Sequence, residues 1–223
     1  MSTPGTVADL LARLRASDPG RPRLTWYGAD GERVELSARV LENWVAKTAN
    51  LLVEELDAVP GTRVHLALPA HWRSLVWVLA VAAVGAEPGG PAEADVVVTD
   101  QPGLPGPAGA LLVVVTLPAL ALRAGSALPA RALDYNAEVA GYGDSVPVVA
   151  GAPPVEVVQA LAPQERVLLG AEGTDPVSAA GVLLDALAVD GSLVLLGPGA
   201  LDAERVSSQE QVTARRRTDR TAL

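Results

Sequence analysis

The stretch PGTRVHLALPAHW, residues Pro60–Trp72, decides the fold. It lies between two long apolar helical patterns and opens with a Pro-Gly turn. Val64, Leu66 and Leu68 then put alternate apolar side chains on one face of a short strand, and Pro69 separates this strand from the next helix. A turn, a buried strand and a helix in this order are typical of a parallel strand in an α/β domain.

Strand and helix patterns alternate along the chain, which predicts an α/β fold with a doubly wound, mostly parallel sheet and helices on both faces. Strands are expected at Arg63–Leu68, Val96–Thr99, Leu111–Val115, Arg166–Leu169 and Ser192–Leu196. Helices are expected at Thr6–Arg15, Ala38–Leu56, Trp72–Val84, Val155–Leu161 and Pro176–Leu187. An antiparallel hairpin is expected over Arg23–Ser37, with its turn at Asp30-Gly31.

The helix at Ala38–Leu56 has the most regular pattern. Apolar residues recur at helical spacing along it, so Leu41, Val45 and Leu52 are predicted to be buried behind a charged outer face. The four tryptophans also fall on apolar stripes, which predicts core positions for Trp26, Trp44, Trp72 and Trp77.

The pattern weakens over Arg123–Gly143 and recovers near Val155. Residues 1–202 are therefore interpreted as a single α/β domain, and residues 203–223 as a polar, flexible C-terminal tail that ends in RRRTDRTAL. The run Arg215–Arg217 within that tail is interpreted as solvated.

Composition excludes several classes of function. A formal net charge of −9 argues against nucleic-acid binding, because affinity for a polyanion depends on Lys and Arg. The absence of cysteine excludes disulfides, thiolate nucleophiles and cysteine-based zinc sites. The most apolar run, Ser74–Ala86, is shorter than a membrane helix, and the amphipathic pattern of Val7, Leu10, Leu11 and Leu14 does not predict a signal peptide, so the cytoplasm is the expected location.

The order of hairpin, long helix, PGTRVHLALPAHW, an apolar helix ending AVAAVGAEP, and ADVVVTD resembles the start of adenylate-forming enzymes, the acyl-CoA synthetase and AMP-dependent ligase superfamily. The resemblance covers Leu24–Asp100 and, more loosely, Arg166–Leu196. A narrower resemblance is to a short actinobacterial family distantly related to that N-terminal region. These matched features belong to the scaffold.

The resemblance implies enzymes that join a carboxylate to AMP from ATP and use a phosphate loop of the type T-S-G-T-T-G-x-P-K-G. In that loop, glycines, hydroxyls and a lysine surround the phosphates. The corresponding interval here, Gly141–Pro154, reads GYGDSVPVVAGAPP and has no threonine or lysine. The family's metal and adenine motif and its C-terminal lysine domain also have no match, and Tyr142–Asp144 echoes the ribose motif too early in the chain.

A second alignment places a decayed phosphate loop at Glu172, Gly173 and Thr174, the sequence-predicted cofactor-binding residues. The alternative is structural, because Gly173 and Asp175-Pro176 supply the turn and helix start that a strand-to-helix connection needs. Residues 74–204 hold three arginines against fifteen acidic residues, a net charge of −12, which opposes a polyphosphate there.

The two histidines are too few for a histidine-based metal site, so no metal is expected. His65 is predicted to be a hydrogen-bonded structural residue. His71 is predicted at a helix start, with the alternative that it faces a pocket beyond the preceding strand. No catalytic residue is assigned, because neither a G-x-S-x-G elbow nor material for a serine triad is present.

The leading hypothesis is a non-catalytic binding or interaction module on a truncated adenylate-forming scaffold. It has no resident cofactor, and its partner is a protein or a small acyl or adenosine-like ligand, with no nucleic acid and no membrane. The alternative is a reduced AMP-forming acyl ligase, completed by a partner chain, that binds ATP or AMP weakly. The sequence does not specify an oligomeric state.

Overall fold

The computed structural model describes residues 5–104, 106–158, 160–200 and 202–216. Its internal contacts divide the chain into two compact units. Unit 1 comprises Met1–Leu41, Pro69–Leu75 and Pro154–Leu223, and unit 2 comprises Glu42–Leu68 and Val76–Pro153. This division does not test the single domain expected over residues 1–202, which stays a prediction.

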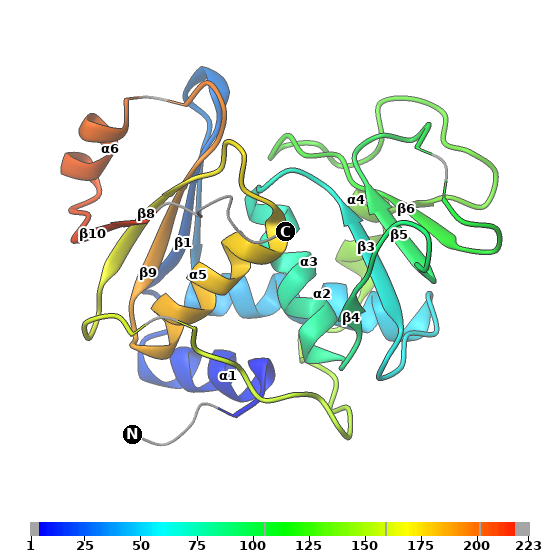
Figure 1. The fold of residues 1–223 in the computed structure, drawn as a ribbon, viewed down its shortest axis with the longest axis horizontal. Helices are drawn as coiled ribbons and strands as arrows, with labels where there is room; N and C mark the ends of the chain where they lie inside the picture. The colour runs from blue at the N-terminus through cyan, green and yellow to red at the C-terminus, as the bar shows by residue number, and fades with distance from the viewer. Residues whose placement is uncertain (1–4, 105, 159, 201, 217–223) are drawn as a thin grey trace. The chain divides into compact units, whose positions relative to one another are not determined.

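Unit 1 is built on a five-stranded sheet in the order β10-β8-β9-β1-β2 (Figure 1). Its strands are β1 (Pro22–Tyr27), β2 (Arg33–Ser37), β8 (Arg166–Gly170), β9 (Ser192–Leu196) and β10 (Ala214–Arg216). The pairs β10–β8, β8–β9 and β9–β1 are parallel, and β1–β2 is the antiparallel hairpin that the sequence predicts. The short helix η1 (Ala29–Gly31) makes its turn.

Helices cover both faces of this sheet. Those of unit 1 are α1 (Val7–Ser17), α5 (Pro176–Ala188) and α6 (Ala203–Gln209). One side of α5 is buried, including Ala179, Ala180, Leu183, Ala186 and Leu187, and α5 packs on β8 and β9. On the other face, Val206 of α6 joins a cluster with side chains of β1, β8 and β9. Coverage of both faces is what buried parallel strands require.

Unit 2 contains a second five-stranded sheet, in the order β4-β3-β5-β6-β7, in which every pair is parallel. Its strands are β3 (Arg63–Ala67), β4 (Glu87–Pro88), β5 (Val96–Thr99), β6 (Leu111–Val114) and β7 (Leu133–Asp134). The short helices α4 (Tyr135–Glu138) and η2 (Val139–Gly141) follow β7. The long helices α2 (Ala38–Glu54) and α3 (Trp72–Ala83) begin in unit 1 and continue in unit 2.

The predicted α/β class is confirmed, and the strands expected from the sequence are present, but the described residues form two sheets where one was predicted. Strand periodicity identifies a strand without identifying its neighbours. The buried stripe of α2 is confirmed, since Leu41, Val45 and Leu52 are fully buried. Trp26, Trp72 and Trp77 are buried as predicted, whereas Trp44 is only partly buried.

The predicted helix at Val155–Leu161 is wrong, because none of its described residues is helical. Prolines at 153, 154 and 163 flank this segment and disfavour a helix. Its backbone amides instead have partners elsewhere in unit 1. The amide of Val155 donates to the Gly5 carbonyl at 2.9 Å, and the amide of Val158 donates to Asp185 Oδ1 at 2.8 Å.

The flexible tail expected from residue 203 also differs from the structure, because α6 and β10 lie within it and β10 pairs with β8. Contacts of Glu210 explain why this segment forms regular secondary structure. Its buried carboxylate accepts hydrogen bonds from the Tyr27 hydroxyl at 2.5 Å, from Arg33 Nε at 3.0 Å and from Arg166. Three strands of the sheet thus hold the segment that joins α6 to β10. Arg217 and the following residues to Leu223 lie outside the described part.

We predict that Leu52→Ala lowers the free energy of unfolding by about 2 to 5 kcal/mol, because it leaves a cavity in a fully buried position of α2. Urea denaturation measures this change. Glu54→Ala, at an exposed position of the same helix, is the control. An unchanged denaturation midpoint for Leu52→Ala would contradict the packing of α2.

We also predict that Glu210→Gln lowers the free energy of unfolding by about 2 kcal/mol, because it removes charge-assisted hydrogen bonds to a buried carboxylate. The matched control is Glu204→Gln, which breaks only the exposed ion pair with Arg215 and is expected to change stability little. Equal effects of the two variants in the same denaturation experiment would argue against an anchoring role for Glu210.

Candidate functional site

A pocket of about 560 Å³ in unit 1 contains two of the three residues that the sequence singles out. It lies where β8 and β9 end, the edge at which parallel α/β sheets bind ligands. Its lining residues are Leu168, Gly170, Glu172, Thr174, Leu196, Ala203, Arg215 and Arg216. Glu172 and Thr174 therefore face the pocket, and Gly173 lies between them in the turn that connects β8 to α5.

This turn has the local structure of an ordinary strand-to-helix connection. Gly173 adopts a φ of 70°, in the left-handed region that favours glycine. The amide of Thr174 donates to the Ala171 carbonyl at 3.1 Å, and its hydroxyl donates to the Gly170 carbonyl at 3.0 Å. The Thr174 hydroxyl thus already has a backbone acceptor within the turn.

The first amides of α5 are occupied by the protein itself. Asp175 is the N-cap, and its Oδ1 accepts hydrogen bonds from the amides of Val177 at 3.0 Å and Ser178 at 2.9 Å, while Oδ2 accepts from the Ser178 hydroxyl at 2.6 Å. Partial burial alone would raise the pKa of Asp175, but these hydrogen bonds outweigh it and lower that pKa below its ordinary value. A carboxylate therefore stands where a phosphate would need these amides.

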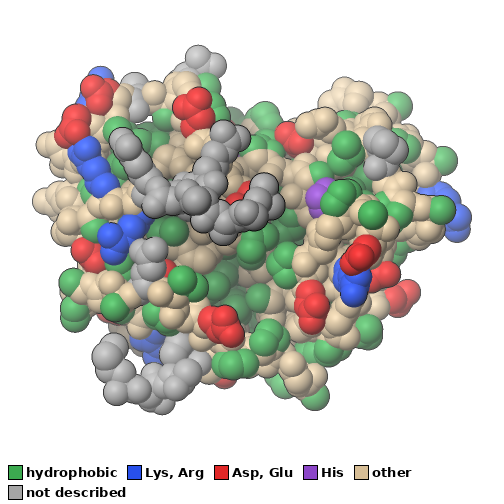
Figure 2. Space-filling model, in the orientation of Figure 1, with side chains coloured by type: hydrophobic (Ala, Val, Ile, Leu, Met, Phe, Trp, Pro, Cys, Tyr) green, Lys and Arg blue, Asp and Glu red, His purple; other side chains and the backbone are tan. Residues whose placement is uncertain are grey.

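The pocket is also lined by Arg215 and Arg216 of β10, which the sequence pattern places in a solvated tail. Arg215 donates to both carboxylate oxygens of Glu204, at 2.5 and 2.7 Å, and to the Ser207 hydroxyl at 2.9 Å. Arg216 is the next residue and pairs in register with Leu169 of β8. Basic and acidic side chains gather over α6 and β10 on the face drawn in Figure 2. Only the pairing of β10 with β8, which no local pattern indicates, brings these arginines to the site.

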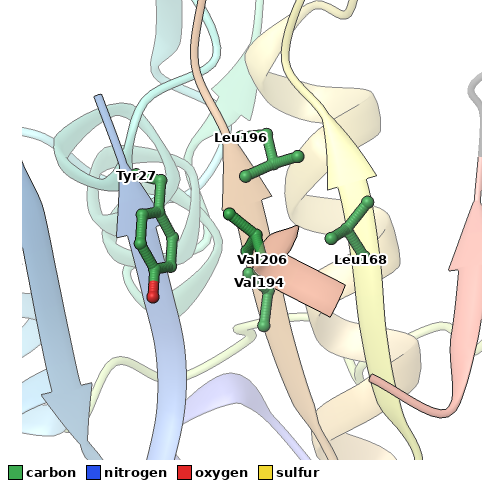
Figure 3. Close-up of a cluster of buried hydrophobic side chains, with 5 residues drawn as sticks. All are labelled: Tyr27, Leu168, Val194, Leu196 and Val206. Atoms are coloured by element: carbon green, nitrogen blue, oxygen red, sulfur yellow. The ribbon is translucent and has the colours of Figure 1, made fainter. Parts of the chain in front are cut away.

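The floor of the pocket is aliphatic. Leu168 and Leu196 belong to a buried cluster with Tyr27, Val194 and Val206 (Figure 3). Figure 3 shows these side chains together, with Val206 reaching the strands from α6. The site thus combines apolar surface, one carboxylate and two guanidinium groups, and it lacks an uncommitted hydroxyl or helix amide in the described turn.

The structure places His71 at a helix start, as predicted. The ring is buried, its Nδ1 accepts the Arg73 amide at 3.2 Å, and its centroid lies 4.6 Å from that of Trp26. Burial, together with the charge of Arg73, lowers the pKa of His71 to about 3. His71 is therefore neutral at physiological pH. His65 is partly buried, and its Nδ1 lies 3.1 Å from the Gly89 carbonyl oxygen, in agreement with a structural role.

Tyr142–Asp144, the echo of a ribose motif, is held by Lys47 of α2. The ammonium group donates to the carbonyl oxygens of Ala140 at 3.1 Å and Tyr142 at 2.5 Å, and it pairs with Asp144 at 2.7 Å. These contacts supply a structural reason for the sequence GYGD. Across the described residues, no cluster of three or more histidine or acidic side chains has the arrangement of a metal site. No helix in that part of the chain is both long and apolar enough to span a membrane.

Comparison with known proteins supports the resemblance seen in the sequence. A protein of Mycobacterium tuberculosis, described as a TIGR03089 family protein, is 34% identical over 246 aligned residues, which cover 96% of this chain and 99% of that one. No model of a protein family matches the sequence.

Solved structures of acyl-CoA synthetases have the same fold. Acetoacetyl-CoA synthetase from Streptomyces lividans matches with a TM-score of 0.69 at 18% identity over 96% of this chain. Acyl-CoA synthetase from Brucella canis matches with a TM-score of 0.70 at 20% identity over 98% of this chain. The chain spans 42% and 48% of these two synthetases. It spans 60% of the Klebsiella oxytoca NpsA N-terminal subdomain, at a TM-score of 0.63 and 16% identity. The predicted resemblance to the N-terminal region of this superfamily is confirmed at the level of the fold.

We predict that the free energy of unfolding falls as the pH drops below about 6.5. In the unfolded chain His71 takes up a proton near that pH, whereas in the folded protein its pKa is lowered to about 3 and the ring stays neutral. The stabilisation that neutral His71 gives the folded state is fully present above the pKa of the unfolded histidine. The loss of this stabilisation reaches roughly 3 to 4 kcal/mol near pH 3.5.

The measurement is urea denaturation between pH 7 and 3.5 for the wild type and for His71→Asn, which keeps an acceptor for the Arg73 amide but does not titrate. Subtracting the pH-dependent free energy of unfolding of the variant from that of the wild type removes the contribution of the carboxyl groups and leaves that of His71. Parallel curves for the two proteins would refute the assignment of His71 as a buried neutral side chain.

Proposed function

The chain belongs to the TIGR03089 family, and we propose that it is a non-catalytic binding module on the N-terminal scaffold of adenylate-forming enzymes. The pocket between Thr174 and the arginines of β10 is its binding site. The ligand is a small acyl or adenosine-like molecule whose apolar part rests on Leu168 and Leu196.

The observation that carries this proposal is the self-capped start of α5. Phosphate binding at a strand-to-helix turn needs free backbone amides, hydroxyls and positive charge. Here the amides of Val177 and Ser178 donate to Asp175, and the Thr174 hydroxyl donates to a carbonyl. Asp175 and Glu172 add negative charge at the same end of the strand. The turn therefore favours the uncharged part of a nucleotide or acyl ligand over its phosphates.

The arginines of β10 do not restore a phosphate site. Arg215 is engaged by both oxygens of Glu204, so its charge is largely balanced by a neighbouring carboxylate. Arg216 alone adds positive charge to a lining that also contains Glu172. One guanidinium suits a carboxylate or a polar ligand edge, whereas a triphosphate needs several such partners.

A second function is a reduced AMP-forming ligase that a partner chain completes. The observation in its favour is coverage, because the chain spans less than half of the Streptomyces and Brucella synthetases while it matches their fold. In this case, ATP–pyrophosphate exchange would appear when a candidate partner and a carboxylic acid are added. A persistent lack of exchange with the chain alone and with such partners agrees with the binding module.

We predict that Mg-ATP binds with a Kd at or above about 1 mM, equivalent to only about −4 kcal/mol. Isothermal titration calorimetry with Mg-ATP, AMP and adenosine at physiological salt measures this. Adenosine is expected to bind at least as well as Mg-ATP, because it leaves out the phosphates that Asp175 and Glu172 repel.

The variant Thr174→Val removes the one hydroxyl of the turn, and Ser126→Ala removes a hydroxyl of unit 2 as the control. Neither variant is expected to change the weak Mg-ATP signal. Micromolar Mg-ATP binding that is lost in Thr174→Val or in Glu172→Gln would overturn the proposal and restore the phosphate-loop interpretation of Glu172, Gly173 and Thr174.

A further inference from the structure

A second pocket, of about 410 Å³, lies in unit 2 where the parallel strands β5 and β6 end. Like the first, it is at the carboxyl edge of a parallel sheet. Most of its lining is aliphatic, and Asp100, Thr116 and Ser126 are the polar side chains in it. The lining residues are Asp100, Pro102, Val114, Val115, Thr116, Leu117, Pro118, Ala124, Gly125 and Ser126.

Asp100 directly follows β5, and one of its carboxylate oxygens lacks a partner. Oδ1 is buried from solvent and makes no hydrogen bond within the described residues. A buried, unsatisfied acceptor is rare in folded proteins and costs free energy. Burial raises the pKa of Asp100, and the hydrogen bond from its own backbone amide offsets only part of that rise. Within the described residues, Oδ1 therefore lacks the hydrogen-bond donor that a buried acceptor needs.

Hydrogen bonds hold the β6–β7 connection, which lines this pocket, in place. Asn136 is buried, and its side chain accepts from the Thr116 amide at 3.0 Å while donating to the carbonyls of Thr116 at 3.0 Å and Ala121 at 2.8 Å. Asp134 accepts from the Ala124 amide at 2.8 Å. Both segments of the β6–β7 connection that line the pocket are thus tied to the residues at β7.

Two further properties point to a cationic ligand. The hydroxyls of Thr116 and Ser126 belong to the same lining as the carboxylate and supply two further acceptors there. Unit 2 contains eleven acidic and four basic residues, a net charge of −7. A field of this sign attracts cations to the pocket and repels anions.

We propose that this pocket binds a small primary amine in its protonated form, with the ammonium group paired with the Asp100 carboxylate and a short aliphatic chain against the apolar lining. An ammonium group has three donors, which the carboxylate and the two hydroxyls accept. A divalent metal fits less well, because such ions take several oxygen ligands and the lining has a single carboxylate.

The probe is n-butylammonium, titrated into the ¹⁵N-labelled full chain and followed by NMR. We expect saturable shifts at the amides of Asp100, Thr116 and Gly125 in the wild type. Asp100→Asn is expected to weaken binding about tenfold or more, because it removes a charge-assisted hydrogen bond. A carboxyl-detected titration is expected to show the pKa of Asp100 falling when the amine is bound, since an adjacent positive charge favours the carboxylate.

The matched control is Asp57→Asn, which makes the same chemical change in the same unit but before β3, outside this pocket. It is expected to bind butylammonium as the wild type does. n-Butanol and butyrate have a similar chain without the positive charge. The proposal fails if either one shifts the same amides with equal affinity, if Asp100→Asn binds as tightly as the wild type, or if folded wild type shows no saturable shifts.

Discussion

Both sheets consist mainly of parallel strands, and such strands must be covered on both faces. In unit 1, α5 covers one face, while the other depends on α6, whose Val206 packs against Tyr27, Leu168, Val194 and Leu196. A helix of seven residues has little stability of its own. The hydrogen bonds of Glu210 to Tyr27, Arg33 and Arg166 hold the segment that follows it, and β10 continues from there along β8. The hydrogen bonds of Glu210 thus explain why α6 is ordered and covers this face of the sheet. They also explain why Arg215 and Arg216 of β10 reach the pocket.

Much of this fold could be predicted because the relevant signals are local. The turn and alternation around Pro60 indicate β3, and the helical stripe of α2 indicates which of its residues are buried. Predictions failed where distant partners decide. Val155 and Val158 have apolar spacing that suits a helix, yet their amides bond to Gly5 and Asp185. Residues 203–216 look like a polar tail until Glu210 meets side chains from three strands.

In the candidate site, too, some residues could be located from the sequence and others could not. Glu172 and Thr174 could be located from sequence, because a strand, a glycine turn and a helix start follow one another there. Arg215 could not, since it reaches the pocket only through the pairing of β10 with β8. Asp100 stands at the end of a predicted strand, so its position at a sheet edge was within reach of the sequence. The missing partner of its Oδ1 depends on the packing of the β6–β7 connection, which has no regular pattern.

Two aspartates that follow strands show how one residue type creates opposite sites. Asp175 accepts the amides and the hydroxyl that begin α5, so its charge is satisfied internally and the helix start is closed to an anion. Asp100 Oδ1 has no such donor within the described residues, so a ligand that donates a hydrogen bond would satisfy it. At Asp175, the helix amides that phosphate binding requires are already occupied. At Asp100, one carboxylate oxygen still lacks a hydrogen-bond donor within the described residues. The two proposals share one physical basis, because the acidic composition of the chain opposes polyphosphates and favours cations at these two edges.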